Sequence, residues 1–290
     1  MTASESLPAL KRLYNAGRLL PFVGAGLSMS VRWSDAAGVE RRGPSWTELV
    51  DAAARELQAD PALLRARGED LQILEYFRLK FGGRMARLTN WLVQNMTVPD
   101  EALCHNILLV ELAAMTNCRL FYTTNFDGLL EKGLVLHGRQ VAVIATEEEI
   151  AVAIERDARE DAICQVVKFH GDLEHPDAMV VSEADYRRRL ALETTMDDRL
   201  KADLLGRVVL FIGYSFRDWN VSYLFHVLTT LHGNAPDSAT GRRGYIFVAD
   251  PSDFEIRLFA SREIEVLGVR SGAHMATDIA GILRQITERS

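Results

Sequence analysis

Cysteine is scarce in this chain, and the three that occur, Cys104, Cys118 and Cys164, are scattered without any C-x-x-C spacing. Cysteine pairs at that spacing are the usual ligands of a structural zinc ion. The sequence therefore excludes a zinc module built on such pairs. Two of the three cysteines lie in apolar stretches, which is typical of small buried hydrophobic residues.

Long apolar runs and an excess of basic charge are missing as well. No apolar stretch reaches the roughly 18 residues that a membrane-spanning helix needs, and the N-terminus lacks the basic-then-apolar pattern of a secretory signal. Acidic residues outnumber basic ones, 40 against 33, and the net charge of −7 argues against a general nucleic-acid-binding surface. The basic run Arg187-Arg188-Arg189 therefore predicts a solvated helix face. We expect a cytoplasmic protein in a reducing compartment.

The chain does contain short stretches rich in β-formers that alternate with helical patterns. Strands are predicted at 19–23, 119–122, 141–144, 163–169, 208–212, 245–248 and 264–267, and helices at 7–16, 147–156, 218–231 and 276–287. This alternation predicts an α/β fold, a parallel sheet with helices on both faces. Helical patterns between the first two strands predict an insertion at about 45–116, opened by a capping box of Ser45 and Glu48. No linker is visible, so residues 1–290 are predicted to form a single domain.

A glycine loop, Gly24-Ala25-Gly26-Leu27-Ser28, directly follows the first predicted strand. Backbone amides at Gly24 and Gly26 can approach a pyrophosphate closely, and Ser28 adds a hydroxyl donor. The alternative is that a tight turn needs glycine for conformational reasons alone. The dehydrogenase fingerprint is not met, because Met29 stands where a third glycine would be. No Gly-Lys-Ser/Thr occurs either, which excludes a Walker loop.

An Asn/Asp pair, Asn125 and Asp127, follows the second predicted strand. The amide can hydrogen-bond a ribose hydroxyl or a water, and the carboxylate can accept a hydrogen bond from a carboxamide. The alternative is local: Asp127 caps a helix at 128–133, and Asn125 turns the chain.

A histidine, His170, stands at the end of the strand predicted at 163–169 and is followed by Gly171. A histidine in this position can serve as a general base near neutral pH, and the glycine lets a ligand come close. His175 with Asp172 and Glu174 could suggest a metal, but no second cluster supplies further ligands. We therefore predict no metal site.

Two later turns complete the set of candidates. Gly213 and Ser215 follow the strand at 208–212 and are typical of a phosphate- or ribose-binding turn. Ser215 does not fit a hydrolase nucleophile elbow, because Arg217 stands where glycine is needed. Asp250 ends the next strand and is predicted to lie near an adenosine.

Four motifs, taken in their order along the chain, resemble those of the sirtuin superfamily, whose members bind NAD on a Rossmann-like domain. These motifs are G-A-G-L-S, T-T-N-F-D, F-H-G-D and G-Y-S-F. The resemblance spans roughly residues 18–270. Protein deacylases of that superfamily have glutamine and isoleucine where this chain has Thr124 and Phe126, and they carry a four-cysteine zinc module. Their Pro-Asp-Phe-Arg segment is replaced here by residues 29–33. The chain is more similar to the prokaryotic sirtuin-like domains of antiphage defence, which cleave NAD.

The resemblance implies a role for each candidate residue. Asn125 would orient the nicotinamide ribose or the attacking water, Asp127 would contact the nicotinamide amide, and His170 would act on the ribose hydroxyls. The remaining residues would bind the rest of NAD: Gly24, Ala25, Gly26, Ser28, Thr124, Gly213, Ser215 and Asp250.

The resemblance also implies an activity and a setting. The expected reaction cleaves the bond between nicotinamide and ribose, with NAD as substrate, giving nicotinamide and ADP-ribose in antiphage defence by NAD depletion. The alternatives are an NAD-dependent protein deacylase and a non-catalytic NAD or ADP-ribose sensor. Since an unregulated NAD hydrolase would kill its host and residues 1–290 leave no obvious sensor, we expect a homo-oligomer with a separately encoded partner. A HerA-type ring ATPase or an Argonaute-like protein is the kind of partner that the resemblance implies.

Overall fold

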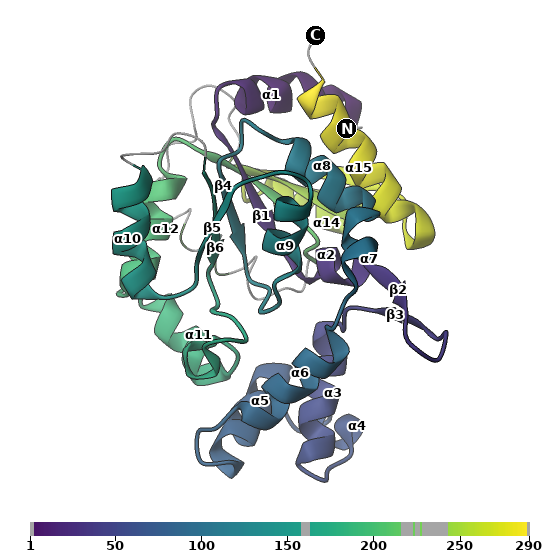
Figure 1. The fold of residues 1–290 in the computed structure, drawn as a ribbon, viewed down its shortest axis with the longest axis vertical. Coiled ribbons are helices and arrows are strands. Elements are labelled where there is room, and N and C mark those ends of the chain that lie inside the picture. The colour runs from purple at the N-terminus through teal and green to yellow at the C-terminus, as the bar shows by residue number, and fades with distance from the viewer. Residues whose placement is uncertain (1–2, 158–162, 216–222, 224–226, 228–242, 289–290) are drawn as a thin grey trace.

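A seven-stranded parallel sheet forms the centre of the molecule (Figure 1). The computed structural model describes residues 3–157, 163–215, 223, 227 and 243–288. Across the sheet the strands follow the order β5-β6-β4-β1-β7-β8-β9. Their bounds are β1 Leu19–Val23, β4 Leu120–Thr123, β5 Val141–Ile144, β6 Cys164–Lys168, β7 Val208–Ile212, β8 Gly244–Ala249 and β9 Ile264–Val269. All seven predicted strands are confirmed, with ends shifted by two residues or fewer.

Helices cover both faces of the sheet, as predicted. Along β1, Leu19 and Val23 face one hydrophobic core while Leu20 and Phe22 face the other, because side chains alternate along a strand. The first core is closed by α1 Ala3–Asn15, α2 Ala25–Ser30, α7 Asp100–Cys104, α8 Ile107–Ala114, α9 Leu129–Leu136 and α15 Met275–Thr287. The second is closed by α10 Glu147–Asp157, α12 Thr195–Leu204 and α14 Asp253–Ala260. The fold is thus α/β and Rossmann-like.

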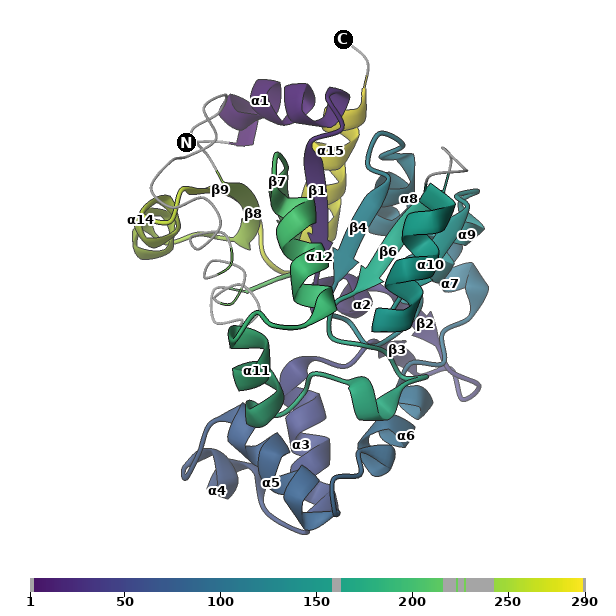
Figure 2. The ribbon, with the colours of Figure 1, turned by 90° about the vertical axis from the view of Figure 1, so that its left-hand side faces the viewer.

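Four helices form a separate group below the sheet, which we call the helical lobe (Figures 1 and 2). They are α3 Trp46–Glu56, α4 Pro61–Arg65, α5 Asp70–Lys80 and α6 Ala86–Asn95. The capping box predicted at the start of α3 is confirmed: the Ser45 amide donates to Glu48 Oε2 over 2.7 Å, and the Glu48 amide donates to Ser45 Oγ over 3.3 Å. Of the helical patterns between 45 and 116, α7 and α8 pack on the sheet instead of in the lobe.

Several elements were not expected from the sequence. A hairpin of β2 Arg32–Ser34 and β3 Glu40–Arg42 follows α2. Between β6 and β7 lie the short turn η1 Pro176–Ala178 and α12, together with α11 Glu183–Leu190, of which only the helix face at Arg187-Arg188-Arg189 was expected. The short turn η2 Gly272–His274 precedes α15. The helix predicted at 218–231 and the position of Arg217 lie outside the described residues.

The prediction of a solvated Arg187-Arg188-Arg189 face is wrong for its third member. Arg189 is only 14% exposed and forms an ion pair with the buried Asp197 over 3.2 Å. Its guanidinium also donates to the Phe169 carbonyl oxygen and lies over the Phe169 ring. Helical periodicity turns Arg189 inward, while Arg187 and Arg188 remain exposed.

Candidate functional site

A cavity of about 930 Å³ opens where the parallel strands end. The strands β1 and β7 are neighbours in the sheet, but the sheet continues from β1 to β4 on one side and from β7 to β8 on the other. Such a reversal of the strand order leaves a crevice at the carboxyl ends of the two strands, where α/β proteins bind ligands. The volume is at the upper end of the usual range for small-molecule sites. Residues from the predicted motifs that line it are Ala25, Ser28, Thr124, Asn125, Asp127, His170 and Ser215. The sheet therefore brings together loops that are up to about two hundred residues apart, as expected for parallel strands.

Asn125 is tied to the glycine loop by its amide group. Its Nδ2 donates to the Gly24 carbonyl oxygen over 3.1 Å and to Ser28 Oγ over 3.0 Å. Its backbone amide donates to Thr123 Oγ1 over 3.1 Å. The Oδ1 atom accepts no hydrogen bond from any residue that the structure describes. The side chain is thus oriented by its nitrogen, and its oxygen remains able to accept a hydrogen bond from a ligand or water.

Asp127 combines the two interpretations that the sequence left open. Its Oδ1 accepts a hydrogen bond from the Leu129 amide over 3.0 Å at the start of α9, and its Oδ2 accepts one from Ser28 Oγ over 2.7 Å. The carboxylate therefore fixes the loop and the glycine-loop serine, and it also lines the cavity. Contact with a nicotinamide amide stays a prediction.

His170 lines the cavity although its side chain is almost fully buried, at 3% exposed. The Tyr186 ring meets it edge-on, with centroids 5.2 Å apart. Burial lowers the pKa of His170 well below its usual value, and the positive charge of Arg189 lowers it further. The imidazole is therefore neutral near pH 7 and able to accept a proton.

The glycines of the loop are explained by close backbone packing. The Gly24 amide donates to the Ile212 carbonyl oxygen over 2.8 Å, and the Gly26 amide donates to the Gly213 carbonyl oxygen over 2.9 Å. A Cβ atom on Gly26 would lie 2.5 Å from the Gly213 Cα, and Gly213 itself has φ +77°. Two turns that touch in this way need glycine on both sides. A role of these glycines in phosphate binding stays a prediction.

Other predicted residues are distributed unevenly around the cavity. Thr124 Oγ1 lies 2.8 Å from the Tyr214 hydroxyl, which donates to the Val23 carbonyl oxygen over 3.1 Å. Ser215 is exposed and lines the cavity. Asp250, by contrast, is not among the lining residues: its amide donates to the Val269 carbonyl oxygen at the far side of β8. The fold thus brings Thr124 and Ser215 to the cavity, but not Gly213 or Asp250.

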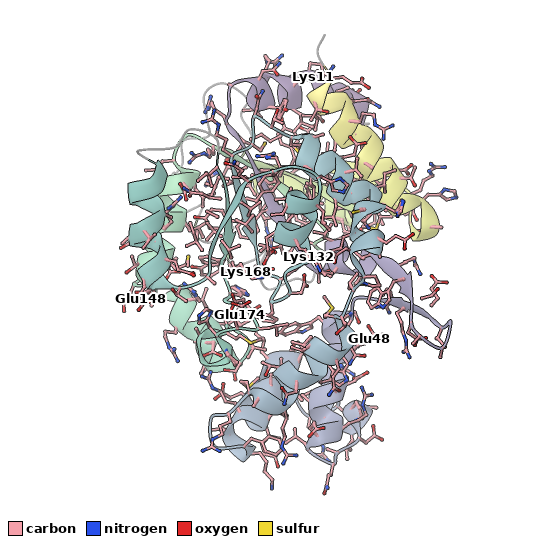
Figure 3. The ribbon with its side chains drawn as sticks, viewed as in Figure 1. Lys11, Glu48, Lys132, Glu148, Lys168 and Glu174 are labelled. Carbon is pink, nitrogen blue, oxygen red and sulfur yellow. The ribbon has the colours of Figure 1, made fainter. Side chains whose placement is uncertain are left out.

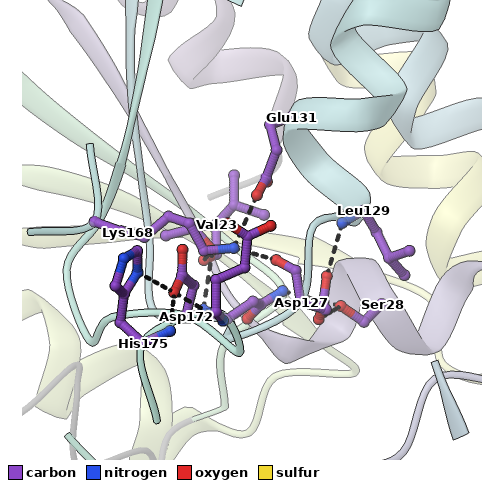
Figure 4. A network of polar contacts seen from close by, with 12 residues as sticks. Val23, Ser28, Asp127, Leu129, Glu131, Lys168, Asp172 and His175 are labelled. Atoms are coloured by element: carbon purple, nitrogen blue, oxygen red, sulfur yellow. Dashed lines mark hydrogen bonds and ion pairs between the residues drawn. The ribbon is translucent and has the colours of Figure 1, made fainter. Parts of the chain in front are cut away.

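A buried ion pair behind the site was missed by the sequence reasoning. Lys168, 1% exposed, lies at the end of the sheet that faces the helical lobe (Figure 3). Its Nζ donates to Glu131 Oε1 over 2.8 Å and to the Asp127 carbonyl oxygen, as Figure 4 shows. Burial raises the pKa of Glu131, and Lys168 opposes that shift. The available signal was a lysine at the end of an apolar strand, two residues before His170.

A second polar contact in Figure 4 joins His175 to Asp172. His175 Nδ1 lies 2.9 Å from Asp172 Oδ1, and the hydrogen bond raises the pKa of this half-exposed histidine. The Asp172 Oδ1 also accepts the amides of Glu174 and His175, so the carboxylate shapes the turn after His170. In the part of the chain that the structure describes, no three His, Cys, Asp or Glu side chains are grouped to hold a metal ion.

The helical lobe forms the opposite wall of the cavity. Its contribution includes Trp46, Leu49, Arg65 and Arg67. The lobe core also packs against Phe126 and Leu173, one from each of the loops that carry Asn125 and His170. A further link is the ion pair of Arg78 on α5 with the buried Asp185 on α11, 2.6 Å long. The lobe is therefore packed directly on the candidate catalytic loops.

Within the described residues, no helix is long and apolar enough to cross a membrane.

The chain is similar to several known proteins. The chain is 29% identical over 207 residues to the NAD(+) hydrolase ThsA of Bacillus cereus (strain MSX-D12), covering 70% of this chain and 38% of that protein. It is 29% identical over 226 residues to ThsA of Cytobacillus dafuensis (78% and 40%). It is 23% identical over 242 residues to the defense-associated sirtuin 2 of Bacillus subtilis (82% and 21%).

The chain spans about two fifths of the length of the ThsA relatives and one fifth of the Bacillus subtilis protein. Residues 119–267, which include the loops of Asn125, His170 and Ser215, match the SIR2-like domain family. This match covers half of the chain and agrees with the order of the motifs, the parallel sheet and the cavity at its carboxyl edge. The chain belongs to the SIR2-like domain family.

Proposed function

We propose that this protein is an NAD hydrolase that cleaves the nicotinamide–ribose bond. The observation that carries the proposal is the pairing of Asn125 and His170 in one cavity. The Oδ1 atom of Asn125 has no partner among the described residues, and His170 is neutral and buried. Relatives named NAD(+) hydrolase support the same reaction.

The chemistry requires little beyond alignment and charge stabilisation. The bond between the nicotinamide nitrogen and ribose C1′ breaks, and both of its electrons leave with neutral nicotinamide. Positive charge develops on the ribose, and Asn125 Oδ1 orients the water that attacks C1′. The attacking water loses a proton as its oxygen bonds to C1′. A ribose hydroxyl takes up this proton while it passes its own proton to the neutral imidazole of His170, to which it is hydrogen-bonded. The products are nicotinamide and ADP-ribose.

We assign the remaining binding residues from their positions in the cavity wall. Ala25 and Ser28 lie where the glycine loop faces the cavity, and Ser215 lies on the β7 side, where we propose that the adenosine end binds. A single catalytic domain, a homo-oligomer and a separately encoded regulatory partner stay predictions. The relative named a defense-associated sirtuin supports a role in defence.

Product analysis tests the proposal. Purified protein is incubated with NAD, and nicotinamide and ADP-ribose are separated by chromatography, with and without an acyl-lysine peptide. We expect equal amounts of both products and no dependence on the peptide. Consumption of the peptide in step with NAD would indicate a deacylase, and ADP-ribose binding without any product would indicate a sensor. Either result would replace the proposal.

A further inference from the structure

The substrate proposed above carries a pyrophosphate, and the glycine loop has few donors left for it. The amides of Gly24 and Gly26 donate to carbonyl oxygens of the β7 turn, over 2.8 and 2.9 Å. The Ser28 hydroxyl donates to Asp127. Because these groups are already engaged inside the protein, a dianionic pyrophosphate needs a further cation or donor in the cavity wall.

Two arginines line the cavity, and both come from the helical lobe. Arg65 is engaged: its guanidinium lies 2.5 Å from Asp51 and 3.0 Å from Asp70, and it also donates to the Thr47 carbonyl oxygen. Arg67 lies two residues further on, in the turn between α4 and α5. Its exposed side chain forms no ion pair or hydrogen bond with any residue in the described part of the chain. Arg67, unlike Arg65, is thus available to bind a ligand.

The carboxylates of the cavity wall do not neutralise Arg67. Asp70 is paired with Arg65, and Asp127 accepts hydrogen bonds from Ser28 and the Leu129 amide. Glu69 is the remaining carboxylate, exposed at the start of α5 and also part of the wall. Arg67 is therefore a positive charge available to a ligand, with one acidic neighbour whose charge acts in the opposite sense.

We propose that Arg67 binds the pyrophosphate of the dinucleotide and so holds the substrate in the cavity that Asn125 and His170 line. This inference rests on the proposed function. A guanidinium can donate two parallel hydrogen bonds to phosphate oxygens, a geometry that an ammonium group does not reproduce. Arg67 is then a substrate-binding residue supplied by the helical lobe, while the reacting groups come from the sheet.

The experiment compares four variants: Arg67→Ala, Arg67→Lys, Glu69→Gln and, as matched control, Arg84→Ala. Arg84 is an exposed arginine of the same lobe that is not part of the cavity wall. Steady-state NAD cleavage gives KM and kcat, and calorimetry gives the affinity for ADP-ribose at low and high salt. NADP is run beside NAD to separate pyrophosphate binding from binding of a 2′-phosphate.

For Arg67→Ala we expect KM for NAD and the dissociation constant of ADP-ribose to rise about tenfold, with kcat nearly unchanged. Arg67→Lys should recover part of the loss, and Glu69→Gln should tighten binding by about twofold at low salt. The Arg84→Ala variant should match the wild type, and the salt dependence of ADP-ribose binding should weaken only without Arg67.

Unchanged KM and ADP-ribose affinity in Arg67→Ala would overturn the inference, as would an effect confined to NADP. The proposed function fails separately, if wild-type protein releases no nicotinamide. ADP-ribose binding that still depends on Arg67 would then uphold the phosphate assignment without the hydrolase.

Discussion

The sheet body and the helical lobe contribute to one cavity by different means. In the body, parallel strands pair side by side between two apolar cores, and their ends carry Asn125 and His170. The lobe has a smaller core and contains ion pairs such as that of Arg65 with Asp51. The proposed reacting groups therefore come from the sheet body, and a charged, partly exposed wall comes from the helical lobe.

The contact between the two regions contains both apolar packing and an ion pair. Phe126 and Leu173 extend from the body into the lobe core, and Arg78 reaches from the lobe to Asp185. We call this contact between body and lobe the seam. Changes deep in the body should affect the stability of the whole molecule, whereas changes at the seam should affect activity through the position of His170.

The largest loss of stability is expected for Lys168→Met. It removes the ammonium group that pairs with the buried Glu131 carboxylate and donates to the Asp127 carbonyl oxygen. Breaking one side of a buried ion pair costs about 3–5 kcal/mol. Urea unfolding followed by circular dichroism measures it.

A matched control is Lys132→Met, which removes an exposed ion pair with Asp100. Surface pairs of this kind contribute at most about 1 kcal/mol. Similar small changes in both variants would show that the buried pair does not stabilise the body.

A smaller loss is expected for Asp185→Ala at the seam. Asp185 is 5% exposed, pairs with Arg78 and accepts hydrogen bonds from Ser182, so its removal should cost about 2–3 kcal/mol. Since α11 also carries Tyr186, which packs on His170, kcat should fall severalfold as well.

Glu56→Ala serves as the control for the seam, because it removes an exposed pair with Arg87 inside the lobe. It should leave kcat unchanged. A fall in stability without any change in kcat for Asp185→Ala would mean that the seam does not position His170.

The smallest effect on stability concerns pH. The pKa of His170 is lowered in the folded protein, so below about pH 6.5 the unfolded chain binds a proton that the folded protein does not. The free energy of unfolding should therefore fall as the pH is lowered from 6.5, by at most about 1.4 kcal/mol per pH unit from this group. The unfolding curves of wild type and His170→Gln, compared between pH 7 and 5, measure the difference.

His175 should change the free energy of unfolding with pH in the opposite direction, and it serves as the control. Its pKa is raised by Asp172, so its contribution is present below pH 6.5 and lost as the pH rises through the folded-state pKa. In His175→Gln the loss of stability below pH 6.5 should persist. If the loss persists equally in His170→Gln, His170 is not the group responsible.

Sequence patterns were sufficient for the sheet because its strands are short apolar runs bounded by turns, such as residues 19–23 before Gly24. Parallel pairing then predicted that the loops after β1, β4 and β6 meet. The hairpin of β2 and β3 was missed because Arg32–Ser34 and Glu40–Arg42 show no apolar alternation. Its strands are joined by pairing and by exposed ion pairs such as Arg32 with Glu40.

Buried charges and the lobe wall could not be predicted for a different reason. Whether Lys168 or Arg189 is buried depends on partners far away in the sequence, Glu131 in one case and the Phe169 carbonyl oxygen in the other. The helical insertion was expected, but the side chains that it turns toward the cavity depend on how the lobe packs. The motif residues identify one side of the candidate site, whereas only the fold reveals the opposite wall.

The central claim is that Asn125 and His170 perform the cleavage. The most direct measurement compares nicotinamide release by wild type, Asn125→Ala and His170→Ala, with ADP-ribose affinity and melting temperature measured on the same preparations. We predict that release falls by about a hundredfold or more in each variant, because Asn125→Ala loses the group that orients the water and His170→Ala loses the general base. Folding should be retained, and ADP-ribose affinity should fall far less than turnover. Full turnover in both variants would contradict the account.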